Sequence, residues 1–476
     1  MQKKSIAENF IYNSLYQIFT LITPFVTAPY VSRVLGADGI GRDSYTNAIV
    51  SYFLLFAVLG TNVYGQQEVA KRQDNKEELN KCFWEIFVVR FICISACIVS
   101  FIVFLSVYNE YKIELCIRSL TIIALLFDLS WFFQGIEEFK LVVVRNILVK
   151  LVSILCIFVF VKEKDDIYVY ILILSASILF GNLSFLVSIK KYIKKPVVQS
   201  KNLVLHLKNT VVFFIPQIAY TLYGSIDKLM IGIILKSNYD NGYYDQAHKI
   251  IMMATSAISG LNVVMRTRVS YLSSKGSHEQ IRYYMQKSYR LFAMLALPMI
   301  TGIILIAEKF VPLFYGPGYE DVILLLKMFA VIIYSSGLNS MLGIQYLTPM
   351  GMQGKCNIVL ILAAVINIAL NISMIENFGC AGAVVASVVA ESFVAAAYVV
   401  MSKNILSVHD IISNSMPYLF ASGVMGVGYI IIDSMIDNLF VNIPAAVIIY
   451  FLILCCIKDK LLMEILNKLI FKLKLK

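Results

Sequence analysis

Charged and amide side chains interrupt an apolar stretch near residue 128 of this sequence. The run begins at Asp128 and reads Leu-Ser-Trp-Phe-Phe-Gln-Gly-Ile before Glu137. An Asp or Lys at the centre of a membrane helix costs roughly 2.5–3.5 kcal/mol on insertion scales, and such residues usually face a wet cavity or a partner. Asp128, Trp131 and Glu137 are therefore candidates for the wall of a transport path.

Two further sets of polar residues fall deep inside apolar stretches. Asp227 and Lys228 lie about nine residues from the outer end of their span, which is roughly 13 Å at 1.5 Å per residue, and at least one is expected to line a lumen. Glu391 lies amid Ala and Val, either as a protonated packing residue between small-residue faces or as an ion- or proton-responsive site. Asn367 and Asn371, four residues apart, share a helix face and are candidates to meet Glu391.

Cationic residues complete the candidate lining. Arg90 lies inside a span, where its long side chain either snorkels toward the membrane surface or lines the cavity. Of the other candidates, Arg33 and Lys249 lie nearer the outer rim, and Arg145, Arg266 and Arg268 lie near the inner face. Lys150 also lies near the inner face, and for it and these three residues an ordinary flanking role at the ends of spans is the alternative. Several cations facing one cleft would suit a phosphate or an acidic sugar.

The composition indicates an integral membrane protein. Of 476 residues, 59% are hydrophobic and 15% are charged, whereas soluble proteins carry about 25% charged residues. The net charge of +11 does not indicate a nucleic-acid partner, because Lys and Arg gather at the edges of apolar stretches. The nine cysteines and four histidines lack metal-site spacing, and no nucleotide-binding motif is present. We therefore expect no cofactor and no enzymatic activity.

Fourteen membrane spans are predicted, each about 20 residues or longer, the length that crosses the ~30 Å hydrocarbon core. They lie at 8–32, 43–65, 83–107, 114–135, 141–161, 167–189, 206–236, 244–265, 286–307, 323–347, 355–376, 379–402, 412–433 and 438–457. Most of the 41 Lys and Arg residues fall in alternate connections, which predicts that both termini are cytoplasmic.

A weak internal repeat suggests how the spans are grouped. The outer turns at 36–45 and 241–246 both contain Gly followed by Asp, and six predicted spans separate them. This predicts an all-α protein with two six-helix bundles related by a pseudo-two-fold axis along the membrane normal, plus two C-terminal helices. The predicted domains are 1–200, 201–403, 404–457 and a cytoplasmic tail, 458–476. That tail is expected to be an amphipathic surface helix, or simply a basic flank.

Several motifs together carry a family resemblance. They are Asn13-Ser14-x-Tyr16, Pro29-Tyr30-x-x-Arg33-Val-Leu-Gly36, Asp128-x-Ser-Trp-Phe-Phe-Gln-Gly-x-Glu137, Asp227-Lys228-x-Met-Ile-Gly232 and Gly242-Tyr-Tyr-Asp-Gln-Ala-x-Lys249. Over about residues 5–400 the chain resembles the Wzx-type flippases of the polysaccharide transporter family. That family belongs to the multidrug/oligosaccharidyl-lipid/polysaccharide exporter superfamily.

The resemblance implies a function in the bacterial inner membrane. It implies alternating-access movement of an undecaprenyl-diphosphate-linked oligosaccharide from the cytoplasmic to the outer leaflet. The family works beside a polysaccharide polymerase and glycosyltransferases, and its sugars vary. Aromatic residues such as Trp131, Phe132 and Tyr220 are candidates to stack on sugar rings. The alternative on the same fold is a cation-coupled exporter of small amphiphiles. A membrane-embedded polymerase or acyltransferase would instead carry a large outer loop or a buried catalytic histidine.

Overall fold

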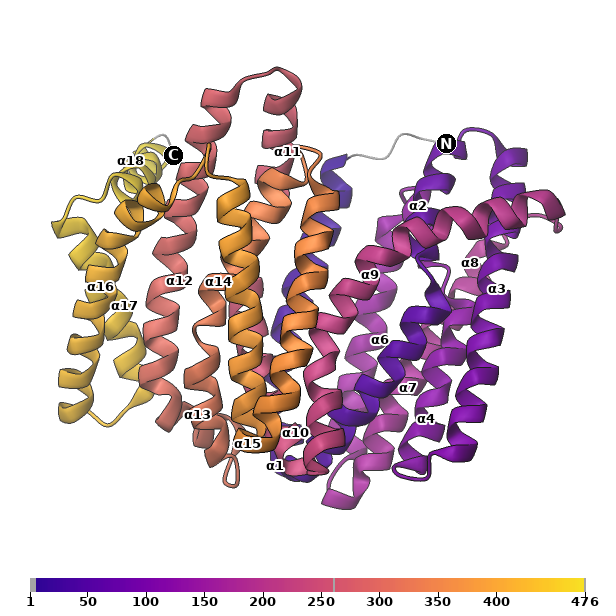
Figure 1. The fold of residues 1–476 in the computed structure, drawn as a ribbon, viewed down its shortest axis with the longest axis horizontal. Helices are drawn as coiled ribbons and strands as arrows, with labels where there is room; N and C mark the ends of the chain where they lie inside the picture. The colour runs from indigo at the N-terminus through magenta and orange to yellow at the C-terminus, as the bar shows by residue number, and fades with distance from the viewer. Residues whose placement is uncertain (1–5, 260–261, 475–476) are drawn as a thin grey trace. The chain divides into compact units, whose positions relative to one another are not determined.

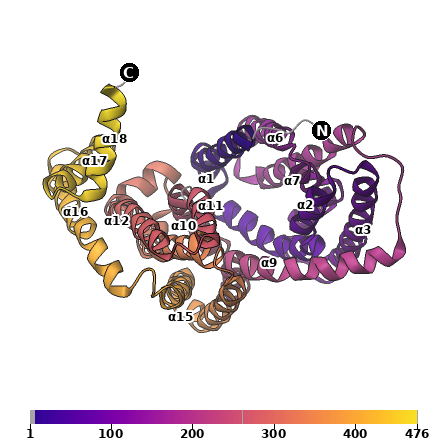
Figure 2. The same cartoon turned by 90° about the horizontal axis from the view of Figure 1, so that it is seen from above.

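The computed structural model describes residues 6–259 and 262–474, and every regular element in these ranges is helical. The chain forms two compact units, Met1–Gly242 and Tyr243–Lys476. Figures 1 and 2 label the helices in two views. The all-α prediction is confirmed for the described ranges. The predicted domain boundaries remain a prediction.

The first unit contains nine α-helices and the beginning of a tenth within the described residues. They are α1 (Ile6–Val58), α2 (Thr61–Arg72), α3 (Lys76–Val107), α4 (Lys112–Ala124), η1 (Leu125–Phe127), α5 (Ser130–Gly135), α6 (Phe139–Phe160), η2 (Lys164–Asp166), α7 (Ile167–Leu183), α8 (Phe185–Ile189), α9 (Ser200–Leu235) and the start of α10 (Asn238–Ser259). In both views α9 lies beside α2 and α3, and it also contacts α1 (Figures 1 and 2).

The second unit contains the rest of α10 and the helices that follow it. They are α11 (Asn262–Ser274), α12 (His278–Tyr315), α13 (Glu320–Phe329), α14 (Ile332–Ser340), the π-helix η3 (Met341–Leu347), α15 (Gln353–Met401), α16 (Val408–Met435), α17 (Leu439–Cys456) and α18 (Lys460–Lys474). The hairpin of α16 and α17 packs against α12, and α18 contacts α12 and α17.

Nine helices of the described chain are long and apolar enough to cross a membrane, or ten if the bent pair α13 and α14–η3 counts as one span. The two longest are long enough to cross twice: Leu15–Arg72 has 58 residues and α15 has 49. Each changes direction at a glycine, Gly36 with φ 68° and Gly379 with φ 61°. The predicted spans 206–236 and 244–265 coincide with α9 and α10, which are not among the nine.

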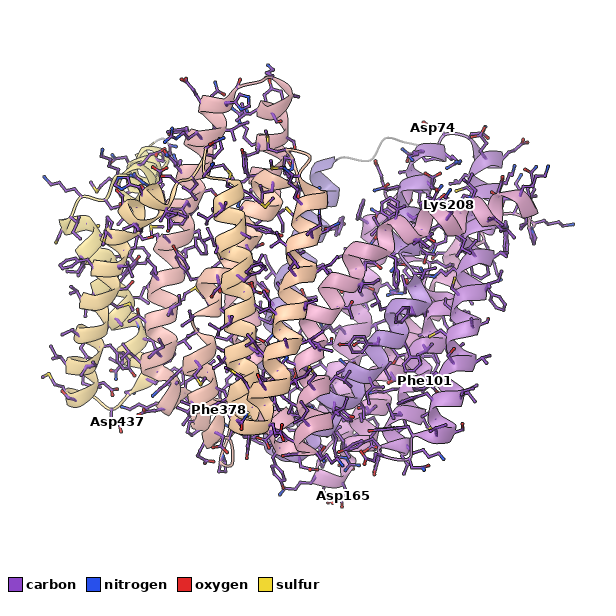
Figure 3. The ribbon with its side chains drawn as sticks, viewed as in Figure 1. Asp74, Phe101, Asp165, Lys208, Phe378 and Asp437 are labelled. Carbon is purple, nitrogen blue, oxygen red and sulfur yellow. The ribbon has the colours of Figure 1, made fainter. Side chains whose placement is uncertain are left out.

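The helix surfaces explain how so apolar a chain folds. On α3, one face is buried with Ile86, Ile94 and Phe101, while Ile92 and Ile102 on another face are more than half exposed. In water such a face would be unfavourable, but in a bilayer it contacts lipid chains. The first unit has two polar ends. Asp74 and Lys208 lie at one end and Asp165 at the other (Figure 3). The apolar helices connecting these ends are the membrane-spanning part.

Candidate functional site

A polar cavity of about 460 Å³ lies among α1, α4, α6 and α7 of the first unit. Its walls carry the side chains of Arg118, Arg145, Lys150, Asn47, Asn146 and Asn182, together with several serines. These elements are mostly apolar, so the polar positions on each helix turn toward one another and away from lipid. A cavity rich in amides, hydroxyls and cations at this depth suits a hydrated, anionic group.

Arg145 of α6 is held in place by neutral acceptors. Its Nη1 donates to the backbone oxygen of Gly181 at 2.9 Å and to Asn182 Oδ1 at 3.1 Å, and its Nε donates to Asn146 Oδ1 at 3.0 Å. The guanidinium also lies over the ring of Phe185, with Cζ 4.1 Å from the ring centroid. These contacts orient the guanidinium without pairing it to a carboxylate among the described residues.

The positive charge of Arg118 on α4 is paired with a carboxylate. Arg118 forms an ion pair with Asp43 and donates from Nε to Thr46 Oγ1 at 2.9 Å and from Nη1 to Asn47 Oδ1 at 3.1 Å. Arg145 and Lys150, in contrast, form no ion pair within the part of the chain that the structure describes. The cavity therefore carries an excess of positive charge. Arg145 and Lys150 are half-buried, and because charges removed from water are normally paired, this excess favours an anionic ligand.

The run at Asp128 forms a packed helix break. The Nη2 of Arg90 on α3 bonds Asp128 Oδ2 at 2.9 Å, and the same guanidinium bonds Thr61 Oγ1 at 3.1 Å. Asp128 Oδ1 accepts from the backbone N–H of Ser130 at 3.1 Å, which starts α5. Thus the two predicted lining residues Arg90 and Asp128 bind each other, and Arg90 is only 1% exposed.

Trp131 is enclosed rather than presented to a cavity. Its side chain is 1% exposed and its ring stacks on Phe83, with centroids 5.6 Å apart. On its other side lies Gly65, where a Cβ would come within 2.6 Å of the indole. In this structure neither Trp131 nor Phe132, which is 0% exposed, has a ring face free to stack on a sugar. Glu137, which ends the motif, is exposed and has a φ of 61°.

The other predicted residues of the first unit lie elsewhere. Arg33 is exposed on α1, and Asp227 of α9 is 5% exposed. The backbone oxygen of Lys228 accepts a hydrogen bond from Asn241 Nδ2 at 2.7 Å. The side chains of Asn13, Ser14, Pro216 and Tyr220, and those of residues 469–476, lie outside the described part of the chain.

The predicted residues of the second unit fall into three groups, which are Lys249, the pair Arg266 and Arg268, and Glu391 with its amide neighbours. Lys249 pairs with Asp245 one helical turn earlier. On α11, Arg266 is exposed, and Arg268 lies over the rings of two tyrosines, 5.7 Å from Tyr271 and 5.1 Å from Tyr284. None of these three residues lines the cavity at Arg145.

Glu391 and its predicted amide neighbours are buried in the second unit. Glu391 of α15 is 9% exposed, and Asn339 of α14 donates to its backbone oxygen at 3.1 Å and to its carboxylate. Asn371 Nδ2 donates to Asn367 Oδ1 at 3.1 Å. Among the described residues no group of three or more His, Cys, Asp or Glu is arranged to hold a metal ion.

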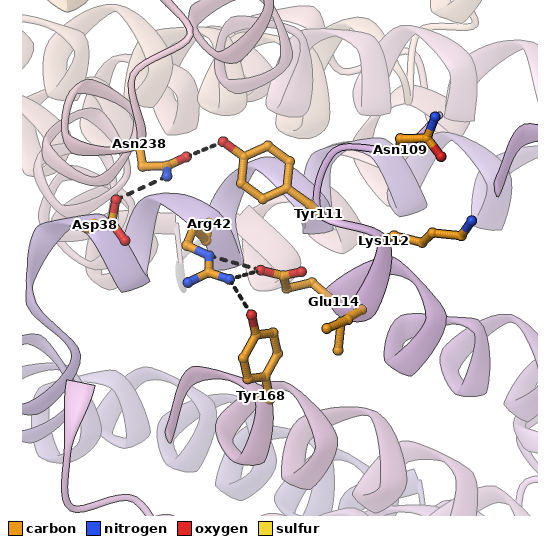
Figure 4. Close-up of a pocket in the computed structure, with 9 residues that line it drawn as sticks. Asp38, Arg42, Asn109, Tyr111, Lys112, Glu114, Tyr168 and Asn238 are labelled. Carbon is orange, nitrogen blue, oxygen red and sulfur yellow. Dashed lines mark hydrogen bonds and ion pairs between the residues drawn. The ribbon is translucent and has the colours of Figure 1, made fainter. Parts of the chain in front are cut away.

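The first unit has a second polar pocket, of about 430 Å³, in which most of the polar side chains bind one another (Figure 4). Arg42 bonds Glu114 and donates to the Tyr168 hydroxyl at 2.9 Å. Asn238 accepts from the Tyr111 hydroxyl at 2.6 Å and donates to Asp38 at 3.0 Å. Burial raises the pKa of Tyr111, so its phenol remains a donor at neutral pH. This pocket lacks the excess charge of the cavity at Arg145.

The sequence-based candidates omitted several residues that line the cavity. Arg118 was visible as a charge inside an apolar stretch, while Asn47, Asn146 and Asn182 gave no distinguishing signal. Asparagine at span ends is common, and only the folded structure brings these amides to one wall.

Apolar helices of membrane length surround a polar cavity, an arrangement typical of multi-pass membrane proteins that handle polar molecules. Residues 6–265 match the family model described as polysaccharide biosynthesis protein, so this chain belongs to that family. It is 23% identical over 410 residues to a candidate O-antigen transporter of Escherichia coli (strain K12), covering 84% of this chain and 98% of that protein. A candidate O-antigen transporter of Shigella dysenteriae is 22% identical over 391 residues, covering 80% and 95%.

Solved structures show the same fold at low sequence identity. The inward closed conformation of the lipid II flippase MurJ matches with a TM-score of 0.76 at 16% identity, covering 96% of this chain and 99% of that one. An inward-facing multidrug resistance transporter of the MATE family matches with a TM-score of 0.61 at 14% identity, covering 85% and 94%. The family match confirms the predicted resemblance to polysaccharide transporters, and these structures show the fold alone.

Proposed function

We propose that this protein is a flippase that moves a lipid-linked oligosaccharide from the cytoplasmic to the outer leaflet of a bacterial inner membrane. The observation that carries this proposal is the polar cavity in which Arg145 and Lys150 have no carboxylate partner among the described residues. The O-antigen transporters and the lipid II flippase among its relatives support the same class of substrate.

The proposed substrate is undecaprenyl-diphosphate carrying an oligosaccharide. Its hydrated sugars and diphosphate cannot enter hydrocarbon unaided, whereas its polyprenyl chain remains in the lipid. The diphosphate would bind Arg145 and Lys150 through charge-assisted hydrogen bonds. The amides of Asn47, Asn146 and Asn182 supply donors and acceptors for nearby hydroxyl groups.

We propose fourteen crossings, with both termini in the cytoplasm. The glycine breaks in α1 and α15 allow each of these long helices to cross twice, and α9 and α10 supply two more crossings. Alternating access would follow from rocking of two six-helix bundles, with the last two spans as an addition. A polymerase and glycosyltransferases are the proposed neighbours in the pathway, and the balance of Lys and Arg between connections supports the orientation.

Reconstitution tests this function. The protein is placed in vesicles containing a fluorescent lipid-linked oligosaccharide, and its arrival in the opposite leaflet is measured with an impermeant quencher. Arg145→Gln and Lys150→Gln should each slow transfer by about tenfold, since each removes one charge-assisted contact. Lys162→Gln is the matched control, because Lys162 is an exposed lysine beyond the other end of α6. Wild-type rates in both cavity variants would refute the proposal.

The alternative is a cation-coupled exporter of small amphiphiles, and one observation favours it. Glu391 is a buried carboxylate, and Asn339 and the pair Asn367 and Asn371 are buried amides of the same unit. If these residues couple transport to Na⁺ or H⁺, Glu391→Gln should abolish the dependence on that gradient. Gradient-driven efflux of a small cationic dye, with no transfer of lipid-linked sugar, would favour the exporter.

A further inference from the structure

A second recess of about 580 Å³ lies along α6 in the first unit and shares Arg145 and Val149 with the cavity. Its polar lining residues are Glu138, Lys140, Arg145 and Ser184, and its apolar lining residues include Leu141, Val144 and Leu148. Val144 is 41% and Leu148 57% exposed, so this wall faces the lipid chains. The recess therefore combines cations with a surface that an acyl or prenyl chain would cover.

The polar end of the recess is at the start of α6. Asp165, which follows α6, lies at the end of the unit opposite Asp74 and Lys208, so Lys140 lies toward the Asp74 end (Figure 3). Lys140 is exposed, and its Nζ lies 5.8 Å from the centroid of the Tyr12 ring. The unbonded N–H groups of the first turn of α6 add to the attraction for an anion at this end.

Glu138 is the carboxylate that lines the recess, and it is hydrogen-bonded within the unit. Its Oε1 accepts a hydrogen bond from the Tyr192 hydroxyl at 2.8 Å. Burial, reinforced by this carboxylate, raises the pKa of Tyr192 to about 12, so the phenol keeps its proton and remains the donor. Lys140 itself forms no ion pair within the described part of the chain, so its positive charge is available at the mouth of the recess.

Arg145 joins the recess to the cavity, because its side chain lines both. Lys140, Arg145 and Lys150 follow one another at five-residue intervals along α6. Each step rises roughly 7.5 Å and turns the side chain to a different face of the helix. The three cations therefore lead from the lipid-facing recess at Lys140, past Arg145, to the interior cavity at Lys150.

We propose that this recess is the entry subsite for a lipid diphosphate, which passes from Lys140 through Arg145 to Lys150 while its chain lies along Val144 and Leu148. The proposal deepens the proposed function and rests on it. A diphosphate carries more negative charge than the single phosphate of a glycerophospholipid, and a series of cations attracts the higher charge more strongly. The structure therefore favours the diphosphate lipid over ordinary anionic phospholipid.

Binding measurements on the full chain in phosphatidylcholine nanodiscs test this subsite. The probes are geranylgeranyl diphosphate, which has a chain, and inorganic pyrophosphate, which has none. Lys140→Gln should weaken binding of geranylgeranyl diphosphate by about tenfold, as expected for one lost charge-assisted contact, and leave pyrophosphate binding unchanged. Leu148→Ser should also weaken only the lipid probe, and Lys140→Arg should retain its binding.

Lys162→Gln is a closely matched control. Lys162 flanks the opposite end of α6 and also lies over a tyrosine of α1, with Nζ 5.9 Å from the Tyr30 ring centroid. Its loss should change neither probe. If Lys140→Gln behaves like Lys162→Gln while Lys150→Gln weakens both probes, the entry subsite is refuted and the flippase proposal stands.

Two further outcomes would contradict the proposed function or the entry subsite. If neither Arg145→Gln nor Lys150→Gln affects either probe, the proposed function itself loses its binding site. If phosphatidylglycerol, at equal concentration, displaces geranylgeranyl diphosphate from the wild-type protein, the recess is a general phospholipid site and the entry proposal is wrong. Full retention of the lipid probe against phosphatidylglycerol supports the entry proposal.

Discussion

The guanidinium of Arg145 lies over the ring of Phe185, with Cζ 4.1 Å from the ring centroid, while its N–H groups donate to neutral oxygens. Phe185 thereby supports a cation that no carboxylate in the described chain neutralises. Stacking of this kind is worth about 0.5–2 kcal/mol, depending on its exposure. The ring positions the guanidinium without removing the charge that an anionic ligand would use.

Phe185→Leu should therefore slow transfer of lipid-linked oligosaccharide by about threefold to tenfold, because Arg145 loses its support. Phe101→Leu serves as the control, since Phe101 is equally buried and contacts the rings of Phe53 and Phe104 instead. Transfer rates are normalised to protein that remains folded in the vesicles. Equal losses in both variants would mean that packing alone, rather than the stacked cation, sets the rate.

Asp128→Asn should destabilise the protein by about 3–5 kcal/mol, because it leaves the charge of Arg90 buried without a counter-ion. Asp437→Asn removes one partner of Lys309 at a position where the carboxylate side chain is 86% exposed, so its cost should be below about 1 kcal/mol. Thermal unfolding in detergent compares the two. If the Asp128→Asn protein has normal stability but does not transport, then Asp128 acts on the substrate path rather than in stabilising the fold.

Gly65→Ala should lower the unfolding temperature, because the new methyl group would approach the Trp131 ring to 2.6 Å. Overpacking of this kind costs about 1–3 kcal/mol. Gly224→Ala is the control, since its Cβ meets nothing within 4 Å. Tryptophan fluorescence follows both variants, because Trp131 is one of two tryptophans in the chain. An unchanged spectrum and stability in Gly65→Ala would contradict the enclosed position of the indole.

Gly36→Ala should cost about 1–3 kcal/mol, because the backbone there has φ 68° and ψ 177°, a conformation that is essentially restricted to glycine. Gly302→Ala, within α12 and with open space around its Cβ, should be neutral or slightly stabilising. Unfolding in detergent measures both. If Gly36→Ala matches Gly302→Ala, the break in α1 does not depend on that glycine.

The helices were predictable because their signal is local. Runs of apolar residues of membrane length, and glycines between them, locate most elements and the breaks in α1 and α15. The partners of the buried charges were not predictable in the same way. Arg90 and Asp128 are 38 residues apart and Arg118 and Asp43 are 75 apart, and hydrophobic periodicity carries no information about which helices meet.

For the same reason the burial of the aromatic run could not be predicted from the sequence. Tryptophan is a residue type that can stack on a sugar ring, yet Gly65 on α2 leaves space for the Trp131 ring inside the core. Similarly, Arg145 had the position of an ordinary flanking cation. Arg145 differs from an ordinary flanking cation through its contacts with Gly181, Asn182 and Phe185, which come close to it only when α6, α7 and α8 pack together.

A cryo-electron microscopy structure with a bound polyprenyl diphosphate tests the central claim most directly. The account predicts phosphate density in the cavity, within hydrogen-bonding reach of both Arg145 and Lys150, with the chain leaving toward lipid. Density for the diphosphate at a site that contacts neither residue, with the cavity empty or closed by a carboxylate against Arg145, would contradict it.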